Sequence, residues 1–245
     1  MRIDLLTLFP EACESFFSAS VLGRARRAGL VTIQCHNIRD YTTDPHGKVD
    51  DRPFGGGPGM VMMCQPVVDA VEAVERLAPG PGTRILLTPQ GERLDQRIVE
   101  DLAAHDRLIV VAGHYEGFDE RIRLALAPRE ISVGDYVLSG GEAAAMVLTD
   151  AVVRLIPGVL GDAESASEES FSIVDAPVSL EALSDGEPTQ RGILEYEQYT
   201  RPREFRGLEV PEVLVSGDHG RIKAWRSERA KKRTAQRRPD LMPDR

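Results

Sequence analysis

Short apolar runs alternate with longer segments of helical spacing over the first 160 residues of the chain. Strands separated by helices in this order predict a mainly parallel sheet with helices on both faces. The fold class expected here is therefore α/β. The expected strands are residues 3–9, 30–38, 84–87, 107–112 and 131–138. The expected helices are residues 11–28, 60–77, 92–104 and 142–155, and residues 40–59 are expected to form a long loop.

Glycine-rich loops follow three of the expected strands. They are Thr88-Pro89-Gln90-Gly91, Gly113-His114-Tyr115-Glu116-Gly117 and Ser139-Gly140-Gly141. Ligands of open α/β sheets bind outside the carboxyl ends of the strands, and glycine lets a ligand lie against the backbone. Each glycine alone is more typical of a turn, but three such loops in series predict a small-molecule pocket. The chain has no G-x-G-x-x-G and no phosphate-binding P-loop, which argues against an ordinary dinucleotide or P-loop site.

A fourth glycine cluster, Gly55-Gly56-Gly57-Pro58-Gly59, lies inside the long loop and follows Asp50-Asp51-Arg52-Pro53-Phe54. Small and rigid residues in a row cannot pack a core, but they can approach a base or a neighbouring backbone closely. A flexible hinge is the alternative interpretation.

Charge is distributed unevenly, although the net charge of −9 seems to argue against a nucleic-acid partner. Residues 221–238 hold nine Lys and Arg against the single acid Glu228, which gives this stretch +8 and the remainder −17. Such asymmetry indicates a basic arm on an acidic body, with a solvated charged helix as the alternative. Trp225 lies within the arm and is expected to anchor that helix to a small core rather than to stack on bases.

The chain is expected to divide into a domain at residues 1–160, a polar flexible linker at 161–198 and a basic helical domain at 199–245. No apolar run approaches the roughly 20 residues that cross a bilayer, and the first residues do not resemble a signal peptide. Three scattered cysteines and five histidines show no metal-ligand spacing. We therefore expect a cytoplasmic protein with no zinc site and no membrane partner.

Several long motifs resemble those of bacterial tRNA (guanine-N1)-methyltransferases, and they occur in family order over most of the chain. They are Val49–Met60, Gly113–Gly117, Ser132–Glu142, Arg154–Gly161 and Tyr199–Pro202. The resemblance implies the SPOUT fold, a Rossmann-like parallel sheet with a C-terminal trefoil knot, followed by a small helical domain. It also implies a homodimer that methylates guanine N1 in tRNA at the guanosine 3′ of the anticodon. The implied cofactor is S-adenosylmethionine, and the resemblance leaves open whether Mg2+ assists.

The resemblance also implies two sets of binding residues. The cofactor set is Leu87, Thr88, Pro89, Gly91, Gly113, Tyr115, Glu116, Gly117, Ser132, Val133, Gly134, Tyr136, Leu138, Gly140 and Gly141. The tRNA set is Asp50, Pro53, Phe54, Gly55, Gly56, Gly57, Ser170, Tyr199 and Arg201. Neither set contains a metal ligand.

Guanine N1 carries a proton, so its methylation requires a base, and negative charge then develops on O6. The resemblance assigns the base to Glu169 and the O6 contact to Arg154. The family usually has an aspartate in the motif that reads Ser167-Glu168-Glu169-Ser170-Phe171 here. Glu168 is therefore the alternative base. The competing functions are a non-catalytic RNA-binding protein that retains the knotted fold and a small-molecule-binding dimer, and the basic arm argues against the second.

Overall fold

The computed structural model describes residues 1–161, 169–171 and 192–242. Its contacts separate the chain into two units, Met1–Gly161 and Asp162–Arg245. The expected linker at 161–198 lies mostly outside the described residues. Its expected flexibility and the expected domain boundaries stay predictions.

A five-stranded sheet forms the centre of the first unit, with the strand order β2-β1-β6-β5-β7 and parallel pairing throughout. The strands are β1 (Arg2–Thr7), β2 (Thr32–Asn37), β5 (Thr83–Arg93), β6 (Arg107–Ala112) and β7 (Arg129–Ser132). Every residue of β6 is buried, as expected for a central strand that is covered on both faces. The predicted parallel α/β sheet is confirmed.

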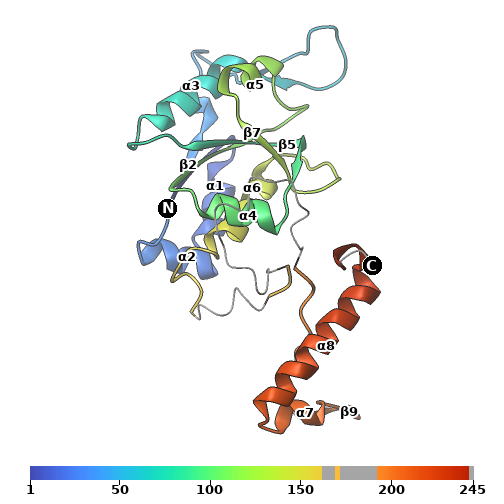
Figure 1. The fold of residues 1–245 in the computed structure, drawn as a ribbon. Coiled ribbons are helices and arrows are strands. Elements are labelled where there is room, and N and C mark those ends of the chain that lie inside the picture. Colours follow the sequence, from blue (N-terminus) through green and yellow to red (C-terminus); the bar gives the residue numbers. More distant parts are fainter. Residues whose placement is uncertain (162–168, 172–191, 243–245) are drawn as a thin grey trace, which may run out of the picture. The chain divides into compact units, whose positions relative to one another are not determined.

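Helices cover both faces of this sheet (Figure 1). One face carries α1 (Pro10–Phe17), α2 (Ser20–Arg27), α4 (Gln96–Ala103) and α6 (Glu142–Val153); the other carries α3 (Cys64–Glu75) and α5 (Glu120–Leu126). Strand β1 shows how alternation supplies the two cores, because Ile3 and Leu5 join the first core and Leu6 joins the second.

The helix expected over residues 11–28 is in fact two helices, α1 and α2. The hydroxyl of Ser18 donates to the carbonyl of Glu14 at 2.8 Å, which caps α1. Ser20 then takes a positive φ of 46°. A Cβ on Gly23 would lie 2.1 Å from the Ser18 carbonyl oxygen, so glycine is needed where the two helices turn.

Other helices and strands also begin or end at residues different from those expected. Strand 84–87 extends through β5 to Arg93, and strand 131–138 ends at Ser132. Helix 92–104 begins only at Gln96, because the carboxylate of Asp95 accepts from the Ile98 N–H and caps α4. Helix 60–77 begins at Cys64, since β4 (Val61–Met62) pairs with β3 (Asp50–Asp51) inside the expected loop. Helix α5 was not predicted.

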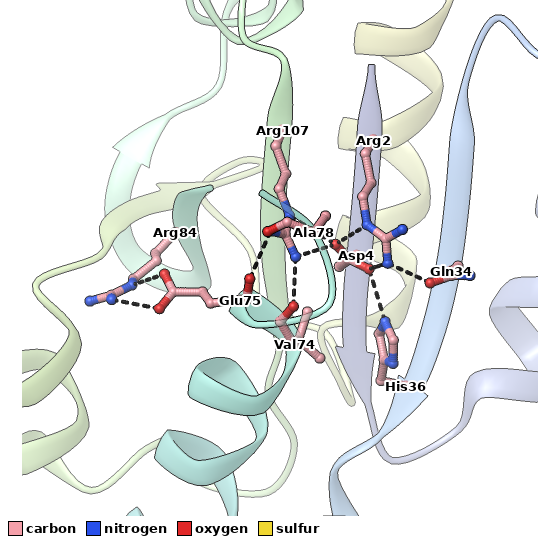
Figure 2. A network of polar contacts seen from close by, with 9 residues as sticks. All are labelled: Arg2, Asp4, Gln34, His36, Val74, Glu75, Ala78, Arg84 and Arg107. Carbon is pink, nitrogen blue, oxygen red and sulfur yellow. Dashed lines mark hydrogen bonds and ion pairs between the residues drawn. The ribbon is translucent and has the colours of Figure 1, made fainter. Parts of the chain in front are cut away.

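A buried polar network joins side chains of β1, β2 and β6 to the end of α3 (Figure 2). The Asp4 carboxylate contacts the side chains of Arg2, His36 and Arg107. Arg107 also donates to carbonyls at the end of α3, including that of Val74 at 2.6 Å. Arg2 and Arg107 lie at the amino ends of β1 and β6, opposite the glycine-rich loops, and Arg107 holds α3 to β6.

The second unit contains α7 (Glu212–Val215), the long α8 (His219–Arg237) and a β8–β9 hairpin (Glu204–Phe205, Leu208–Glu209). The Trp225 ring packs between those of Tyr196 and Tyr199, with centroids 6.5 and 6.4 Å away. Trp225 therefore anchors α8, as expected. No helix in the described ranges combines the length and the apolar character needed to cross a membrane.

Candidate functional site

Three backbone segments surround a cleft of about 370 Å3, which lies at the carboxyl ends of β6 and β7 and beside the middle of β5. We call it the three-loop cleft. Its walls are residues 87–90, 113–118 and 131–141, with Glu120 and Arg123 of α5 and Ala144 of α6. This is the edge of the sheet where the sequence predicted a pocket.

The first wall is a bulge inside β5 rather than a loop that follows a strand. Ile131 pairs with Leu87 and again with Glu92, so the intervening residues are pushed out of the ladder. A Cβ on Gly91 would lie 2.4 Å from the backbone nitrogen of Ile131. Glycine at this position therefore lets the two backbones pass closely, and Gly91 does not line the cleft.

The second wall, residues 113–118, turns sharply after β6. Tyr115 has a positive φ of 62°, which is uncommon for a residue with a side chain. A Cβ on Gly113 would lie 2.4 Å from the Phe118 ring, so glycine lets that ring close over the strand end. These contacts fix the wall without regular secondary structure.

The third wall runs from Ser132 to Gly141. The Ser132 hydroxyl donates to the Gly134 carbonyl at 3.0 Å, and Gly134 takes a φ of 155°. The chain therefore leaves the sheet at Ser132, which explains why β7 is shorter than expected. At the far end the Gly141 N–H donates to the Gly113 carbonyl at 2.7 Å, which joins the third wall to the second.

All the residues of the expected cofactor set except Gly91 line the three-loop cleft. Sequence reasoning left out other lining residues, namely Gln90, His114, Phe118, Glu120, Arg123, Ile131, Val137, Ser139 and Ala144. His114 and Ser139 lie inside the motifs Gly113–Gly117 and Ser132–Glu142, which is a signal for both residues in the sequence. Glu120 and Arg123 belong to α5, which was not predicted, so no pattern placed them near the pocket.

Charged side chains line one side of the cleft. Arg123 donates to Glu130 at 2.8 Å, to Glu120 at 3.1 Å and to Gln90 at 3.3 Å, which connects α5 to β7 and to the bulge of β5. Nearby, Arg121 and its backbone N–H hold the pKa of Asp119 well below its usual range. Asp119 thus caps α5 as a carboxylate.

The glycine cluster at 55–59 lies in the β3–β4 connection, next to the second wall. The Glu116 N–H donates to the Met60 carbonyl, and the Met62 N–H donates to the Gly117 carbonyl, each at 2.9 Å. A Cβ on Gly59 would lie 2.3 Å from a carboxylate oxygen of Glu116. Phe54 is 98% exposed at the start of this cluster. The end of this loop, from Gly59 to Met62, therefore lies against the second wall, and the role of the expected tRNA-contacting residues that precede it stays a prediction.

The expected catalytic residues fall in different units. Arg154 ends α6 in the first unit, and Glu169 belongs to the second, so their pairing stays a prediction. Three expected tRNA residues also lie in the second unit. There the Ser170 hydroxyl accepts from the Glu195 N–H at 3.1 Å, Tyr199 packs on Trp225, and Arg201 is exposed. Glu168 lies outside the described residues.

No three His, Cys, Asp or Glu side chains gather as a metal site within residues 1–161, 169–171 and 192–242.

Comparison with known proteins shows similarity along the whole chain. The family described as tRNA (Guanine-1)-methyltransferase TrmD matches residues 1–244. A tRNA (guanine-N(1)-)-methyltransferase of Rhodopirellula baltica is 53% identical over 247 residues, which cover 100% of this chain and 95% of the relative. Similarly named proteins of Moorella thermoacetica and Bacillus cereus are 52% and 49% identical; the matches cover 99% and 100% of this chain and 90% and 93% of the relatives.

Proposed function

The chain belongs to the tRNA (guanine-1)-methyltransferase family, and on this premise we propose that its methyl donor is S-adenosylmethionine, bound in the three-loop cleft. The protein is an enzyme that methylates guanine N1 in tRNA, the reaction for which its relatives are named. The observation that supports the donor site best is the convergence of three backbone walls, two of them rich in glycine, on one cleft beside the carboxyl ends of β6 and β7 in a parallel sheet.

The residues of the cleft fit this donor in two respects. Leu87, Ile131, Leu138 and Ala144 offer apolar surface for a base, and the backbone of the three walls supplies donors and acceptors. Glu116 also lines the cleft and provides negative charge, which suits a cationic ligand, whereas Glu120 is paired with Arg123. When bound, S-adenosylmethionine supplies a methyl group activated by its sulfonium.

We assign the proton transfer to Glu169, whose carboxylate accepts the N1 proton of guanine as the nitrogen becomes methylated. Arg154 stabilises the charge that develops on O6 by a charge-assisted hydrogen bond. The remaining members of the tRNA set, from Asp50 to Gly57 and from Ser170 to Arg201, would hold the RNA around the target base. The proposed target is the guanosine 3′ of the anticodon.

A trefoil knot and a homodimer complete the proposal. The knot is proposed from the motifs that the chain shares with its family. Exposed apolar side chains on two helices that pack together, Phe16 of α1 and Val147 of α6, support association with a second copy. Light scattering during gel filtration tests the dimer. Action in the cytoplasm stays a prediction.

The decisive experiment is transfer of a radiolabelled methyl group from S-adenosylmethionine to unmodified tRNA, followed by mapping of the modified base. We expect 1-methylguanosine at the position 3′ of the anticodon. Donor binding without transfer would instead favour a non-catalytic RNA-binding protein. Parallel reactions with EDTA and with added Mg2+ decide whether the metal assists.

A further inference from the structure

One carboxylate joins three segments of the chain behind the three-loop cleft. Glu142 is the first residue of α6, and its side chain is 13% exposed. Its Oε1 accepts from the hydroxyl of Thr7, at the end of β1, with a distance of 2.7 Å. Its Oε2 lies 3.4 Å from Nδ1 of His114, in the second wall. The carboxylate therefore links β1, the second wall and α6.

The imidazole of His114 depends on this carboxylate. Its Nδ1 atom is buried and has no hydrogen-bond partner with good geometry among the described residues, and the Glu142 carboxylate is its ion-pair partner. The ring itself is packed between Phe9 and Tyr115, with centroids 5.2 and 5.3 Å away. The orientation of the ring is therefore set by two aromatic contacts and one carboxylate.

The third wall leaves room for this pair. A Cβ on Gly140 would lie 2.3 Å from His114 Nδ1 and 2.4 Å from Glu142 Oε2. The second and third walls also form a β-bridge between His114 and Gly140, next to the bond from the Gly141 N–H to the Gly113 carbonyl. The pair thus occupies the point where the two walls of the cleft meet.

We propose that Glu142 is a positioning residue for binding of the methyl donor; this inference rests on the proposed function. Glu142 acts through His114, which holds the second and third walls of the cleft in place. Removing the carboxylate leaves the buried Nδ1 without a charged partner and frees the Thr7 hydroxyl. Unpaired buried polar groups are costly, so the walls relax to reach water or other partners. The effect falls on donor affinity because both walls line the donor cleft.

The first test measures S-adenosylmethionine affinity of the full chain by calorimetry, together with kcat and KM for methyl transfer. Glu142→Ala should weaken donor binding about tenfold, equivalent to about 1.4 kcal/mol, while kcat changes much less. Glu11→Ala is the matched control, because Glu11 is also an acid in the first turn of a helix and is exposed. It should bind the donor as the wild type does.

A pair of substitutions at His114 separates the polar contact from the packing. His114→Asn keeps a hydrogen-bond donor near the Nδ1 position and loses the ring, whereas His114→Phe keeps a ring and loses the donor. We expect His114→Asn to retain donor affinity within about threefold and His114→Phe to lose about tenfold, because only asparagine keeps a polar group beside the largely buried Glu142 carboxylate. Thermal unfolding of each variant separates misfolding from local change.

The double variant Glu142→Ala/His114→Phe should bind the donor no more weakly than either single variant, because both changes remove one interaction. Additive losses, or wild-type affinity in Glu142→Ala and His114→Phe, would overturn the inference. If the wild-type protein itself neither binds S-adenosylmethionine nor transfers a methyl group, the proposed donor is wrong and the inference fails with it. Unchanged variants of an active wild type refute the positioning role alone.

Discussion

The guanidinium of Arg107 donates to the carboxylate of Asp4 across neighbouring strands, with 3.1 Å between Nη2 and Oδ2 (Figure 2). The Asp4 side chain is fully buried, and that of Arg107 is 5% exposed. Burial of charge is costly unless every group is paired, and here Arg107 also donates to three carbonyls at and after the end of α3. The contact therefore couples the sheet to α3, far along the strands from the proposed donor cleft.

Asp4→Ala should lower the free energy of unfolding by about 3 to 5 kcal/mol, because it leaves two guanidinium groups facing a buried gap. Urea denaturation followed by circular dichroism measures the loss. Lys48→Ala is the control, since it removes one partner of an ion pair with Asp51 in which both side chains are substantially exposed. That change should cost less than about 1 kcal/mol. Equal losses in the two variants would contradict a structural role for the Asp4 network.

Acid should weaken the same network. Burial acts to raise the pKa of Asp4, but hydrogen bonds with His36, Arg2 and Arg107 outweigh it and lower the pKa to about 2. The contribution of Asp4 to the free energy of unfolding is thus complete above its unfolded pKa of about 3.9, and it is lost as the pH falls toward about 2. The difference in unfolding free energy between wild type and Asp4→Asn should shrink over this range. A difference that stays constant from pH 5 to pH 2 would contradict the lowered pKa.

Gly91→Ala should destabilise the fold by about 1 to 3 kcal/mol, because the added methyl group overlaps the backbone of Ile131. Gly161→Ala is a matched control, since a Cβ there meets nothing within 4 Å. Thermal unfolding compares the two. Because Gly91 lies outside the cleft lining, any Gly91→Ala protein that folds at low temperature should still bind the donor. Loss of donor binding without loss of stability would show that Gly91 is a direct contact.

The sequence predicted the parallel sheet well because its strands carry unbroken apolar runs, such as residues 108–112, which are typical of buried strands. It failed where side chains override the pattern. Ser18 ends α1 although the helical spacing continues to residue 28, and Asp95 delays the start of α4. The hydrophobic pattern carries no information on such local hydrogen bonds.

The glycines of the expected cofactor set also show what the sequence could not predict. Gly113 and Gly140 line the cleft, whereas Gly91 permits a backbone crossing from outside it. A glycine in a motif indicates close approach, but it does not tell whether a ligand or the chain itself approaches. The Thr7–Glu142–His114 contacts join residues far apart in the sequence, so no spacing could have shown them.

Exposed lysines of α8 should contribute to tRNA binding through phosphate contacts. Arg229 is engaged with Glu197 at 2.6 Å and packs on Trp225, so its substitution would also disturb the second unit. Lys231 and Lys232 are exposed and suit the test better. Lys231→Ala/Lys232→Ala should weaken tRNA binding and reduce the slope of log K against log salt by about 2. Donor affinity should not change.

The charge-preserving variant Lys231→Arg/Lys232→Arg is the control for this experiment, and it should bind tRNA nearly as the wild type does. Filter binding at several salt concentrations gives both quantities. An unchanged salt slope in the alanine variant would show that this face of α8 does not contact the phosphate backbone.

Glu169 is the proposed base for the N1 proton of guanine. Glutamate carries its carboxylate about 1.5 Å further from the backbone than aspartate, and a misplacement of about 1 Å can cost roughly 100-fold in rate. The reference pKa values of the two acids are close, about 3.9 and 4.3, so reach rather than basicity distinguishes them. We therefore expect Glu169→Ala to slow single-turnover methylation by about 100- to 10,000-fold, the usual worth of a general base. Glu168→Ala should stay near the wild-type rate.

Affinities for tRNA and for S-adenosylmethionine, measured on the same variants, separate a lost proton acceptor from lost binding, and neither should change in Glu169→Ala. Glu169→Asp tests whether the length of the side chain matters. If the backbone at this position adjusts, the aspartate variant keeps most of the methylation rate. If the site is rigid, the variant loses up to about 100-fold in rate. A collapse in Glu168→Ala with a normal rate in Glu169→Ala would move the assignment to Glu168. Normal rates in both would show that the N1 proton leaves by a route that involves neither glutamate.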